Sequence, residues 1–386
     1  MAQPQGPWEL RTPARVVFGA GVAAQLPAII GGYGERSMVI VGSSPERHAG
    51  LVSQLPGEVA VHSVTREPTV AAVQVALTQA RAHRPKVIVG LGGGSVIDTA
   101  KAVGALLEQT DPPEAFLEVI GAGRPVALPG IPVVAVPTCA GAGTEVTRNA
   151  VLSVPEHAVK VSLRGPGVLA EAALVDPLLT LDCPPAVTAS SGMDALTQCL
   201  EPLVSAAANP FSDPFARDGL RRAARNVRRA YASSEDVDAR TEMSLASIMG
   251  GMALTHAKLG AVHGLAGVLG GLLGAPHGAI CARLLPPVIT TTIQALEQRG
   301  PDSAAALDRY NEAAAICLGG QASRHELAPW LNQLVDEMQI PRLTTMGWDP
   351  GLSRRVVQAA IASSSMRGHP LTLTDEELGK ILASAA

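Results

Sequence analysis

The sequence predicts an α/β domain with a parallel sheet in its N-terminal half and an all-helical domain in its C-terminal half. In the first half, short β-branched runs alternate with helical patterns, and uninterrupted apolar strands suit a parallel sheet covered on both faces. From about Thr188 strand-like runs nearly vanish, and long helical patterns follow. Because the chain has 386 residues, 47% of them hydrophobic, it can bury the cores of two domains. We therefore predict domains at residues 1–185 and 186–386, with the boundary near Cys183-Pro-Pro185.

The elements follow from local patterns. The strands predicted in the first half are bounded by Gly, Ser or Pro and cover residues 37–42, 86–91, 132–137 and 172–176. Two amphipathic helices, at 70–83 and 95–107, lie between them, and this alternation implies a doubly wound sheet. The helices predicted in the second half cover residues 192–207, 214–232, 234–254, 259–275 and 301–318. A last helix begins at Thr374-Asp-Glu-Glu377, a capping box.

Composition excludes several classes of function. The net charge is only −4, with Lys and Arg dispersed, and aromatic residues make up 3%, which argues against nucleic acid as a partner. The N-terminus has no signal-peptide pattern, and the apolar run 259–275 is too short and too rich in Gly for a membrane span. The five cysteines are an odd number without C-x-x-C spacing, which favours a reducing compartment. We expect a cytoplasmic homo-oligomer, such as a dimer, that binds a small molecule and neither nucleic acid nor membrane.

Two glycine-rich loops follow predicted strands. The first, Gly90–Lys101, reads Gly-Leu-Gly-Gly-Gly-Ser-Val-Ile-Asp-Thr-Ala-Lys and opens a helix, so its backbone can approach a phosphate at the helix N-terminus. Its spacing is not G-x-G-x-x-G. The second, Pro137–Thr147, is rich in glycine and hydroxyl groups. Each could be only a tight turn, but together they predict a cofactor cleft at the carboxyl ends of the strands.

Two histidines interrupt the nearly apolar segment Val262–Gly278. His263 and His277 are each followed by Gly, which lets another group come close to the ring. A buried imidazole needs a partner, because an unpaired polar group costs about 1–3 kcal/mol. That partner is either a divalent metal or, more simply, a carboxylate or a backbone carbonyl.

A carboxylate supports the metal interpretation. Asp194 and Gln198 stand at i, i+4 on one face of a predicted helix, and Glu201 lies one turn further along. Asp194 with His263 and His277, leaving a fourth position open, is a competent set for zinc or iron. The remaining candidates nearby are expected at the surface or behind the ligands: His256, Lys258 and His369.

Taken in order, these motifs resemble the iron-containing (group III) alcohol dehydrogenase family over nearly the whole chain. The likeness rests on Val17-Phe-Gly-Ala-Gly21, the Gly-Gly-Gly-Ser-x-x-Asp-x-x-Lys turn, Pro-Thr-x-Ala-Gly-x-x-x-Glu-Val-Thr, Leu174-Val-Asp-Pro177, Gly-x-Asp-Ala-Leu, Val-His-Gly and Pro-His-Gly. The resemblance implies a Rossmann-like dinucleotide-binding domain and an all-α metal-binding domain, with nicotinamide and metal between them. It implies an NAD(P)-dependent, metal-assisted alcohol dehydrogenase, or an aldehyde or ketone reductase.

The resemblance also assigns cofactor residues. The pyrophosphate and neighbouring groups fall to Gly93, Gly94, Ser95 and Asp98. The adenine–ribose and nicotinamide end falls to Thr138, Cys139, Thr147, Asn149 and Lys160, with Ser43 after an earlier strand, and Lys160 is also a catalytic candidate. Cys139 stands where the family usually has threonine.

The metal ligands match the family in three of four positions. Asp194, His263 and His277 correspond, whereas Gln198 replaces the usual fourth histidine. An amide oxygen is a neutral, weaker donor, so Gln198 is either a weak fourth ligand or a partner of a metal-bound water. The bound ion, Fe or Zn, is then held weakly or lost, although the related glycerol dehydrogenases look similar in using one Asp and two His around zinc. Gly267 stands where some members carry a further, proton-relaying histidine.

The choice of cofactor and two other functions stay open. The stretch Val41–Ser44 carries no acid to accept from a ribose 2′-OH, and Arg47 and His48 follow, which predicts tolerance of NADP(H). One alternative resembles the maleylacetate reductases, a metal-free reductase in which Gln198, His263 and Lys160 orient the carbonyl. These reductases tend to lose the aspartate that this chain retains. Another resembles the dehydroquinate synthases, but the dense Lys/Arg cluster that a phosphorylated substrate needs is absent from the sequence.

Overall fold

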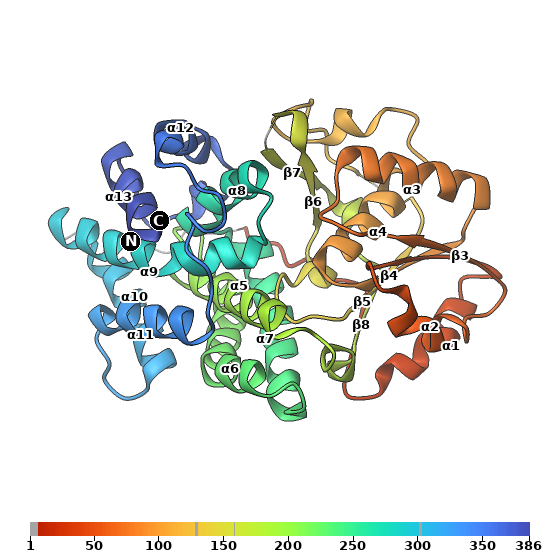
Figure 1. Cartoon of the computed structure of the whole chain (residues 1–386), viewed down its shortest axis with the longest axis horizontal. Coiled ribbons are helices and arrows are strands. Elements are labelled where there is room, and N and C mark those ends of the chain that lie inside the picture. The colour runs from red at the N-terminus through yellow and green to blue at the C-terminus, as the bar shows by residue number, and fades with distance from the viewer. Residues whose placement is uncertain (1–6, 128–129, 158, 301–302) are drawn as a thin grey trace. The chain divides into compact units, whose positions relative to one another are not determined.

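The computed structural model describes residues 7–127, 130–157, 159–300 and 303–386. Its described residues fall into two compact units (Figure 1). The α/β unit consists of residues 12–139 and 144–182. The helical unit consists of residues 183–386, the four residues 140–143 and the N-terminal segment up to Arg11. The short segment 140–143 comes from the middle of the second glycine-rich loop, so that loop contributes to both units.

A six-stranded parallel sheet forms the centre of the α/β unit. Its strands stand in the order β1 (Arg15–Phe18), β8 (Ala172–Val175), β5 (Val133–Pro137), β4 (Val87–Gly92), β2 (Arg36–Val41) and β3 (Glu58–Ser63). Every neighbouring pair is parallel, as the apolar runs predict. If the five strands β2, β3, β4, β5 and β8 are numbered 1 to 5 in chain order, they stand in the sheet in the order 2-1-3-4-5, which is common in doubly wound sheets. The direction of winding reverses between β2 and β4.

Helices cover both faces of this sheet. On one face, α3 (Val70–His83) and α4 (Gly94–Leu106) share a core with Met38 and Ile88, and the antiparallel hairpin of β6 (Asn149–Val154) and β7 (Val159–Arg164) joins it. On the other face, α1 (Leu26–Gly31) packs on Val39 and Val89. A short helix, α2 (Ala49–Val52), follows β2. The hairpin and the edge strands β1 and β3 were not predicted, because they are partly exposed and their continuous apolar runs are no longer than three residues.

Asp176 connects the start and the end of the α/β unit. Its carboxylate accepts hydrogen bonds from the backbone N–H groups of Gly21 and Ala23, at 3.1 and 3.0 Å, and from that of Leu178 at 3.0 Å. These contacts hold the turn after β1 beside the end of β8.

The second half is helical, as predicted. Its helices are α5 (Pro185–Val204), α6 (Ser212–Ala232), α7 (Val237–Ala257), α8 (Ala261–Leu273), α9 (His277–Gln298), α10 (Ala304–Leu318), α11 (Arg324–Glu337), α12 (Ser353–Ala362) and α13 (Asp375–Ala385). They enclose one apolar core to which α5, α8 and α9 contribute many fully buried residues. The capping box at Thr374 is present. The helix predicted from Gly192 begins earlier, at Pro185, because Pro fits the first turn of a helix.

The apolar segment that carries both histidines is two helices. Gly274, with φ of +60°, ends α8 in the left-handed conformation, and Pro276 precedes α9. This break places His277 at the first turn of a new helix. By length and composition α9 could cross a membrane, but 72% of its most apolar window is buried, as in a core helix.

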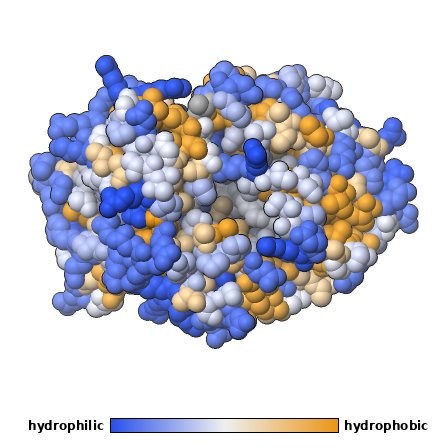
Figure 2. All heavy atoms as spheres, in the orientation of Figure 1, coloured by the Kyte–Doolittle hydropathy of each residue, from blue (hydrophilic) through white to orange (hydrophobic). Residues whose placement is uncertain are grey.

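Hydrophilic side chains prevail on the face drawn in Figure 2, with smaller apolar groups between them.

Candidate metal centre and cofactor loops

Three helices bring four potential metal ligands together in the helical unit. The ligand atoms of Asp194 (α5), His263 (α8), His277 and Cys281 (α9) all lie within 4.8 Å of one another. Asp194 Oδ1 is 3.3 Å from His263 Nε2, and the two imidazole rings have centroids 5.4 Å apart. Two ligands of one tetrahedral zinc, each about 2.1 Å from the ion, stand about 3.4 Å apart. The observed separation therefore matches that of two ligands of one ion.

Unsatisfied buried atoms support the same interpretation. Asp194 Oδ1, Gln198 Oε1 and His263 Nε2 are buried and have no hydrogen-bond partner among the residues that the structure describes. The 3.3 Å contact between Asp194 and His263 lacks the alignment of a hydrogen bond, as expected when both atoms face a third group. Leaving such groups unpaired costs about 1–3 kcal/mol each. A divalent cation satisfies the carboxylate and the imidazole together, so the donor set fits a metal.

A glycine allows the first turn of α9 to approach α5. A Cβ on Gly278 would lie 2.2 Å from the carbonyl oxygen of Ser190 and 3.2 Å from Asp194 Cβ. Any side chain at this position would force the two helices apart. The glycine after His277 therefore brings that imidazole within reach of Asp194, as the sequence pattern suggests.

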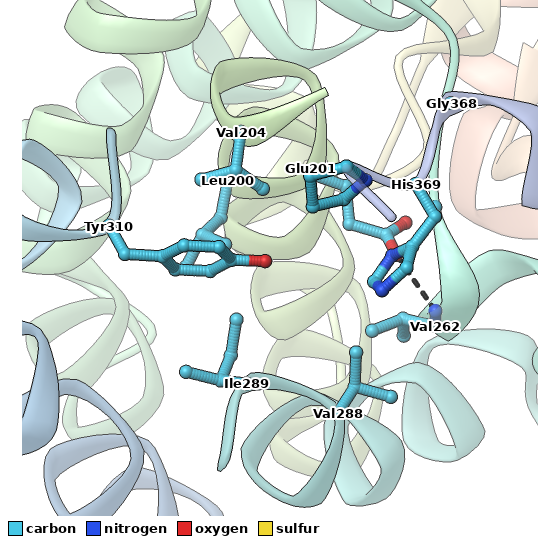
Figure 3. A pocket seen from close by; sticks show the side chains of 11 residues that line it. Leu200, Glu201, Val204, Val262, Val288, Ile289, Tyr310, Gly368 and His369 are labelled. Carbon is cyan, nitrogen blue, oxygen red and sulfur yellow. Dashed lines mark hydrogen bonds between the residues drawn. The ribbon is translucent and has the colours of Figure 1, made fainter. Parts of the chain in front are cut away.

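Glu201 orients His263 from behind. One carboxylate oxygen of Glu201, Oε2, accepts from His263 Nδ1 at 2.6 Å, and Oε1 accepts from the backbone N–H of Val262 at 2.8 Å. Figure 3 shows Glu201 of α5 beside Val262 of α8, with this second bond dashed. Glu201 accepts from Nδ1, so a bound metal that displaces any proton from Nε2 would meet the lone pair of that nitrogen. The carboxylate that the sequence offered as a partner is therefore found on Nδ1, and Nε2 lies 3.3 Å from Asp194 Oδ1; the metal partner stays a prediction.

His369 is part of the wall behind Glu201. It is buried, accepts from the backbone N–H of Ala261 through Nδ1 at 3.3 Å, and lies 3.1 Å from Thr292 Oγ1 through Nε2. Because Thr292 donates to the Val288 carbonyl, His369 must be the donor to Thr292. This neutral tautomer agrees with burial, which lowers the pKa of His369 to about 4. His369 therefore supports the start of α8, as its placement behind the ligands anticipated.

Two other predicted residues have structural partners. His256 Nε2 accepts from the Arg11 backbone N–H at 2.9 Å, so this ring holds the N-terminal segment and is not in the ligand group. Gln198 donates from Nε2 to Asp194 Oδ2 at 3.2 Å.

Burial raises the pKa of Asp194, but the neighbouring His263 and His277 outweigh it and leave the pKa lowered. The carboxylate therefore favours its ionised form.

Sequence reasoning did not select Cys281 or Glu201 as site residues. Cys281 Sγ lies 3.5 Å from His277 Nε2, and burial raises the pKa of the thiol to about 11. The i, i+4 spacing of His277 and Cys281 was a usable signal, since it places both side chains on one helix face. Glu201 stands one turn after Gln198, but only the fold shows which histidine it meets.

The cofactor candidates of the α/β unit follow three adjacent strands. Ser43 comes after β2, Gly93, Gly94 and Ser95 open α4 after β4, and Thr138 and Cys139 follow β5. Parallel strands present their carboxyl ends at one edge, so these residues share the edge where nucleotides bind in such sheets. The N-terminus of α4 offers backbone N–H groups and a positive dipole end for a phosphate. A Cβ on Gly93 would lie 3.4 Å from Cys139 Sγ, so the two loops are in contact.

The remaining candidates of this unit belong to a buried polar network. Lys101, fully buried, donates to the carbonyls of Thr144, Thr147 and Asn149 at 2.7, 2.8 and 2.6 Å. Asp98 accepts from the Thr144 hydroxyl and, at 3.2 Å, from the Val151 backbone N–H. The sequence pointed to Asp98, Thr147 and Asn149 as cofactor contacts, and the structure shows them fixing the second loop against α4. Their contact with cofactor stays a prediction.

Charge burial shifts the pKa values of this network. Burial lowers the pKa of Lys101 to about 8 and raises that of Glu145, in the second loop, to about 7. Lys160 lies on β7, and its ammonium forms an ion pair with Glu67. Its predicted roles toward cofactor and substrate therefore need that pair to open or to be shared.

Comparison with known proteins agrees with this arrangement. Residues 13–177 match a family model described as iron-containing alcohol dehydrogenase, and residues 188–386 match the C-terminal domain of that family. The chain is 32% identical to alcohol dehydrogenase 4 of Saccharomyces cerevisiae over 329 residues, which is 85% of this chain and 83% of the relative. It is 34% identical to long-chain-alcohol dehydrogenase 1 of Geobacillus thermodenitrificans, over 75% of this chain and 76% of the relative. The solved alcohol dehydrogenase from Oenococcus oeni superposes with a TM-score of 0.87 at 28% identity, covering 98% of this chain and 100% of that one.

Proposed function

Because this chain belongs to the iron-containing alcohol dehydrogenase family, we propose that it is an NAD(P)-dependent, metal-assisted alcohol dehydrogenase or aldehyde/ketone reductase. Membership makes it an oxidoreductase acting on CH–OH groups, and the family implies a divalent metal, NAD(H) and a small alcohol or aldehyde. The observation that carries the finer proposal is the group of Asp194 and His263, both buried, and His277, half-buried, whose ligand atoms lie within 4.8 Å of one another.

Each residue of the helical unit has a definite part in this proposal. Asp194, His263 and His277 hold the ion, and Glu201 keeps the proton of His263 on Nδ1. Gln198 holds Asp194 through its amide nitrogen, so Oε1 remains to accept from a hydroxyl group. When bound, the metal polarises the substrate oxygen as a Lewis acid, and the nicotinamide exchanges a hydride with the substrate carbon. Burial of Asp194, Gln198 and His263 would exclude water around them and strengthen their electrostatic interactions.

The α/β unit supplies the cofactor site in this proposal. The N-terminus of α4, at Gly93 to Ser95, binds the pyrophosphate, and Thr138 and Cys139 form the neighbouring wall. We further propose that NADP(H) is accepted, since Arg47 is exposed in the short 3-10 helix Pro45–His48 that follows β2. Measuring turnover with NADH and NADPH in the wild type and in Arg47→Ala tests this. Equal loss with both cofactors, or strict dependence on NADH in the wild type, would contradict it.

Metal dependence distinguishes the proposal from the metal-free reductase. The protein is purified without added metal, analysed for bound metals, and assayed with small aldehydes, ketones and alcohols before and after chelation. We expect chelation to abolish turnover and one divalent ion to restore it. Undiminished turnover in the chelated, metal-free protein would favour the metal-free mechanism. Conversion of substrate without net change in nicotinamide absorbance would favour a lyase.

We also propose a cytoplasmic location and a homo-oligomeric state. The odd number of cysteines supports a reducing compartment. Light scattering after size-exclusion chromatography measures the oligomer, and fractionation of the source cells measures the location. A monomeric mass or an exported protein would contradict these proposals.

A further inference from the structure

We propose that Cys281 is the fourth protein ligand of the metal, so that the ion is held by one carboxylate, two imidazoles and one thiolate. This inference rests on the proposed metal site and assigns the position that Gln198 leaves weak. Cys281 belongs to the group whose ligand atoms lie within 4.8 Å of one another. Gln198 donates its amide nitrogen to Asp194, and its Oε1, a neutral and weaker donor, is the competing candidate for the same position.

The surroundings of Cys281 differ from those of an ordinary core cysteine. Its sulfur lies 3.5 Å from His277 Nε2 and also interacts with His263. Cys199, equally buried in the same core, instead directs its sulfur to the Ala246 carbonyl at 3.6 Å. A fully buried thiol next to two imidazoles and a carboxylate is typical of a ligand position, and the neighbouring orphaned atoms of Asp194 and His263 mark that position independently.

The helix explains why the cysteine can take this role. His277 and Cys281 stand at i, i+4 on the first turns of α9, so their side chains project from the same face toward α5 and α8. The missing histidine on α5 is thereby replaced by a donor on α9. On binding, the S–H bond is replaced by a sulfur–metal bond, and the proton is released to solvent.

A thiolate changes the preference among metals. Soft sulfur ligands favour zinc over the harder ions, which prefer oxygen. We therefore infer that this chain binds Zn²⁺ more tightly relative to Mn²⁺ than an Asp/His/His site with an amide would. In this proposal Gln198 is a positioning residue for Asp194.

The direct experiment uses the wild-type protein. Zinc-loaded protein is measured by X-ray absorption at the zinc edge, where a sulfur neighbour at about 2.3 Å is separated from nitrogen and oxygen neighbours at about 2.0–2.1 Å. The cobalt-loaded protein is expected to show a sulfur-to-cobalt charge-transfer band in the near ultraviolet. A shell of nitrogen and oxygen alone would overturn the assignment of Cys281, while leaving the three-ligand site intact. A protein that binds no metal would overturn both this inference and the metal-assisted function.

Variants then assign the sulfur. Cys281→Ser should lose the charge-transfer band and bind zinc about 100-fold more weakly in competition with a chelator, with a smaller loss for Mn²⁺. Cys199→Ser is the matched control, because it makes the same change at another buried cysteine, and it should keep the band. If Gln198→Ala, and not Cys281→Ser, weakens zinc binding, the fourth ligand is the amide and the inference is wrong. The wild-type spectra decide the question even if a variant fails to fold.

Discussion

The substitution Gly278→Ala tests how closely α9 must approach α5. The added Cβ would lie 2.2 Å from the Ser190 carbonyl oxygen, although Cβ contacts under 3.0 Å essentially never occur, so the first turn of α9 must retreat by about 1 Å. His277 adjoins this residue and would move with the turn. Because metal–ligand distances tolerate only about 0.2 Å, such a shift should weaken metal binding at least about 100-fold.

The free energy of unfolding should change by about 0–2 kcal/mol, which is less than the roughly 2.7 kcal/mol that a 100-fold loss of metal affinity represents. Overpacking costs about 1–3 kcal/mol, and replacing Gly by Ala in a helix returns about 1 kcal/mol. The metal-free protein should therefore melt no more than about 8 °C lower, since 1 kcal/mol shifts Tm by roughly 2–4 °C in a unit of this size.

The assay is a chelator competition for zinc, with thermal unfolding of the metal-free protein alongside it. Gly379→Ala in α13 is the matched control, because a Cβ there meets nothing within 4 Å, and it should bind zinc like the wild type. Zinc affinity of Gly278→Ala equal to that of the wild type would show that the α5–α9 approach does not set the ligand geometry.

Three further predictions concern buried charged or titratable groups. Glu201→Gln should weaken zinc binding about 10–100-fold without changing the ligand set, because an amide orients His263 less firmly; unchanged affinity in the chelator assay would remove its positioning role. Lys101→Met should lower the free energy of unfolding of the α/β unit by about 3–5 kcal/mol, because it leaves three backbone carbonyls and the Asp98 carboxylate without their cation. Urea unfolding measures this change, and a loss below about 1 kcal/mol would refute the account. Burial lowers the pKa of His369 to about 4, so its unfolded form takes up a proton first as the pH falls. The contribution of neutral His369 to the free energy of unfolding is therefore complete above about pH 6.5 and declines by roughly 3 kcal/mol toward pH 4. His369→Gln should flatten this decline when the free energy of unfolding is measured against pH. An unchanged slope would refute the account.

Local patterns were enough to predict much of the fold. The central strands β2, β4 and β5 are buried on both faces, so they read as continuous apolar runs. The edge strand β3 has only half-buried and exposed residues, and its apolar run is limited to Val59–Val61, so the sequence did not indicate it. The capping box at Thr374 was also predictable, because Thr374 and Glu377 interact within one helical turn and the signal is therefore local in sequence.

The sequence by itself determined the two-part architecture and the residue types of the candidate metal site: Asp194, His263 and His277 were identifiable from spacing and from the apolar segments around them. Only the tertiary structure decided which groups surround them. Glu201 meets His263 across 62 positions of the chain, Lys101 reaches the second loop across 43 or more, and Cys281 lies beside residues of two other helices. Hydrophobic periodicity fixes which face of a helix is buried, but it does not fix which other helix that face contacts. That partner is chosen by packing among elements distant in sequence, which is why the proposed fourth ligand and the carboxylate that contacts His263 emerged only from the structure.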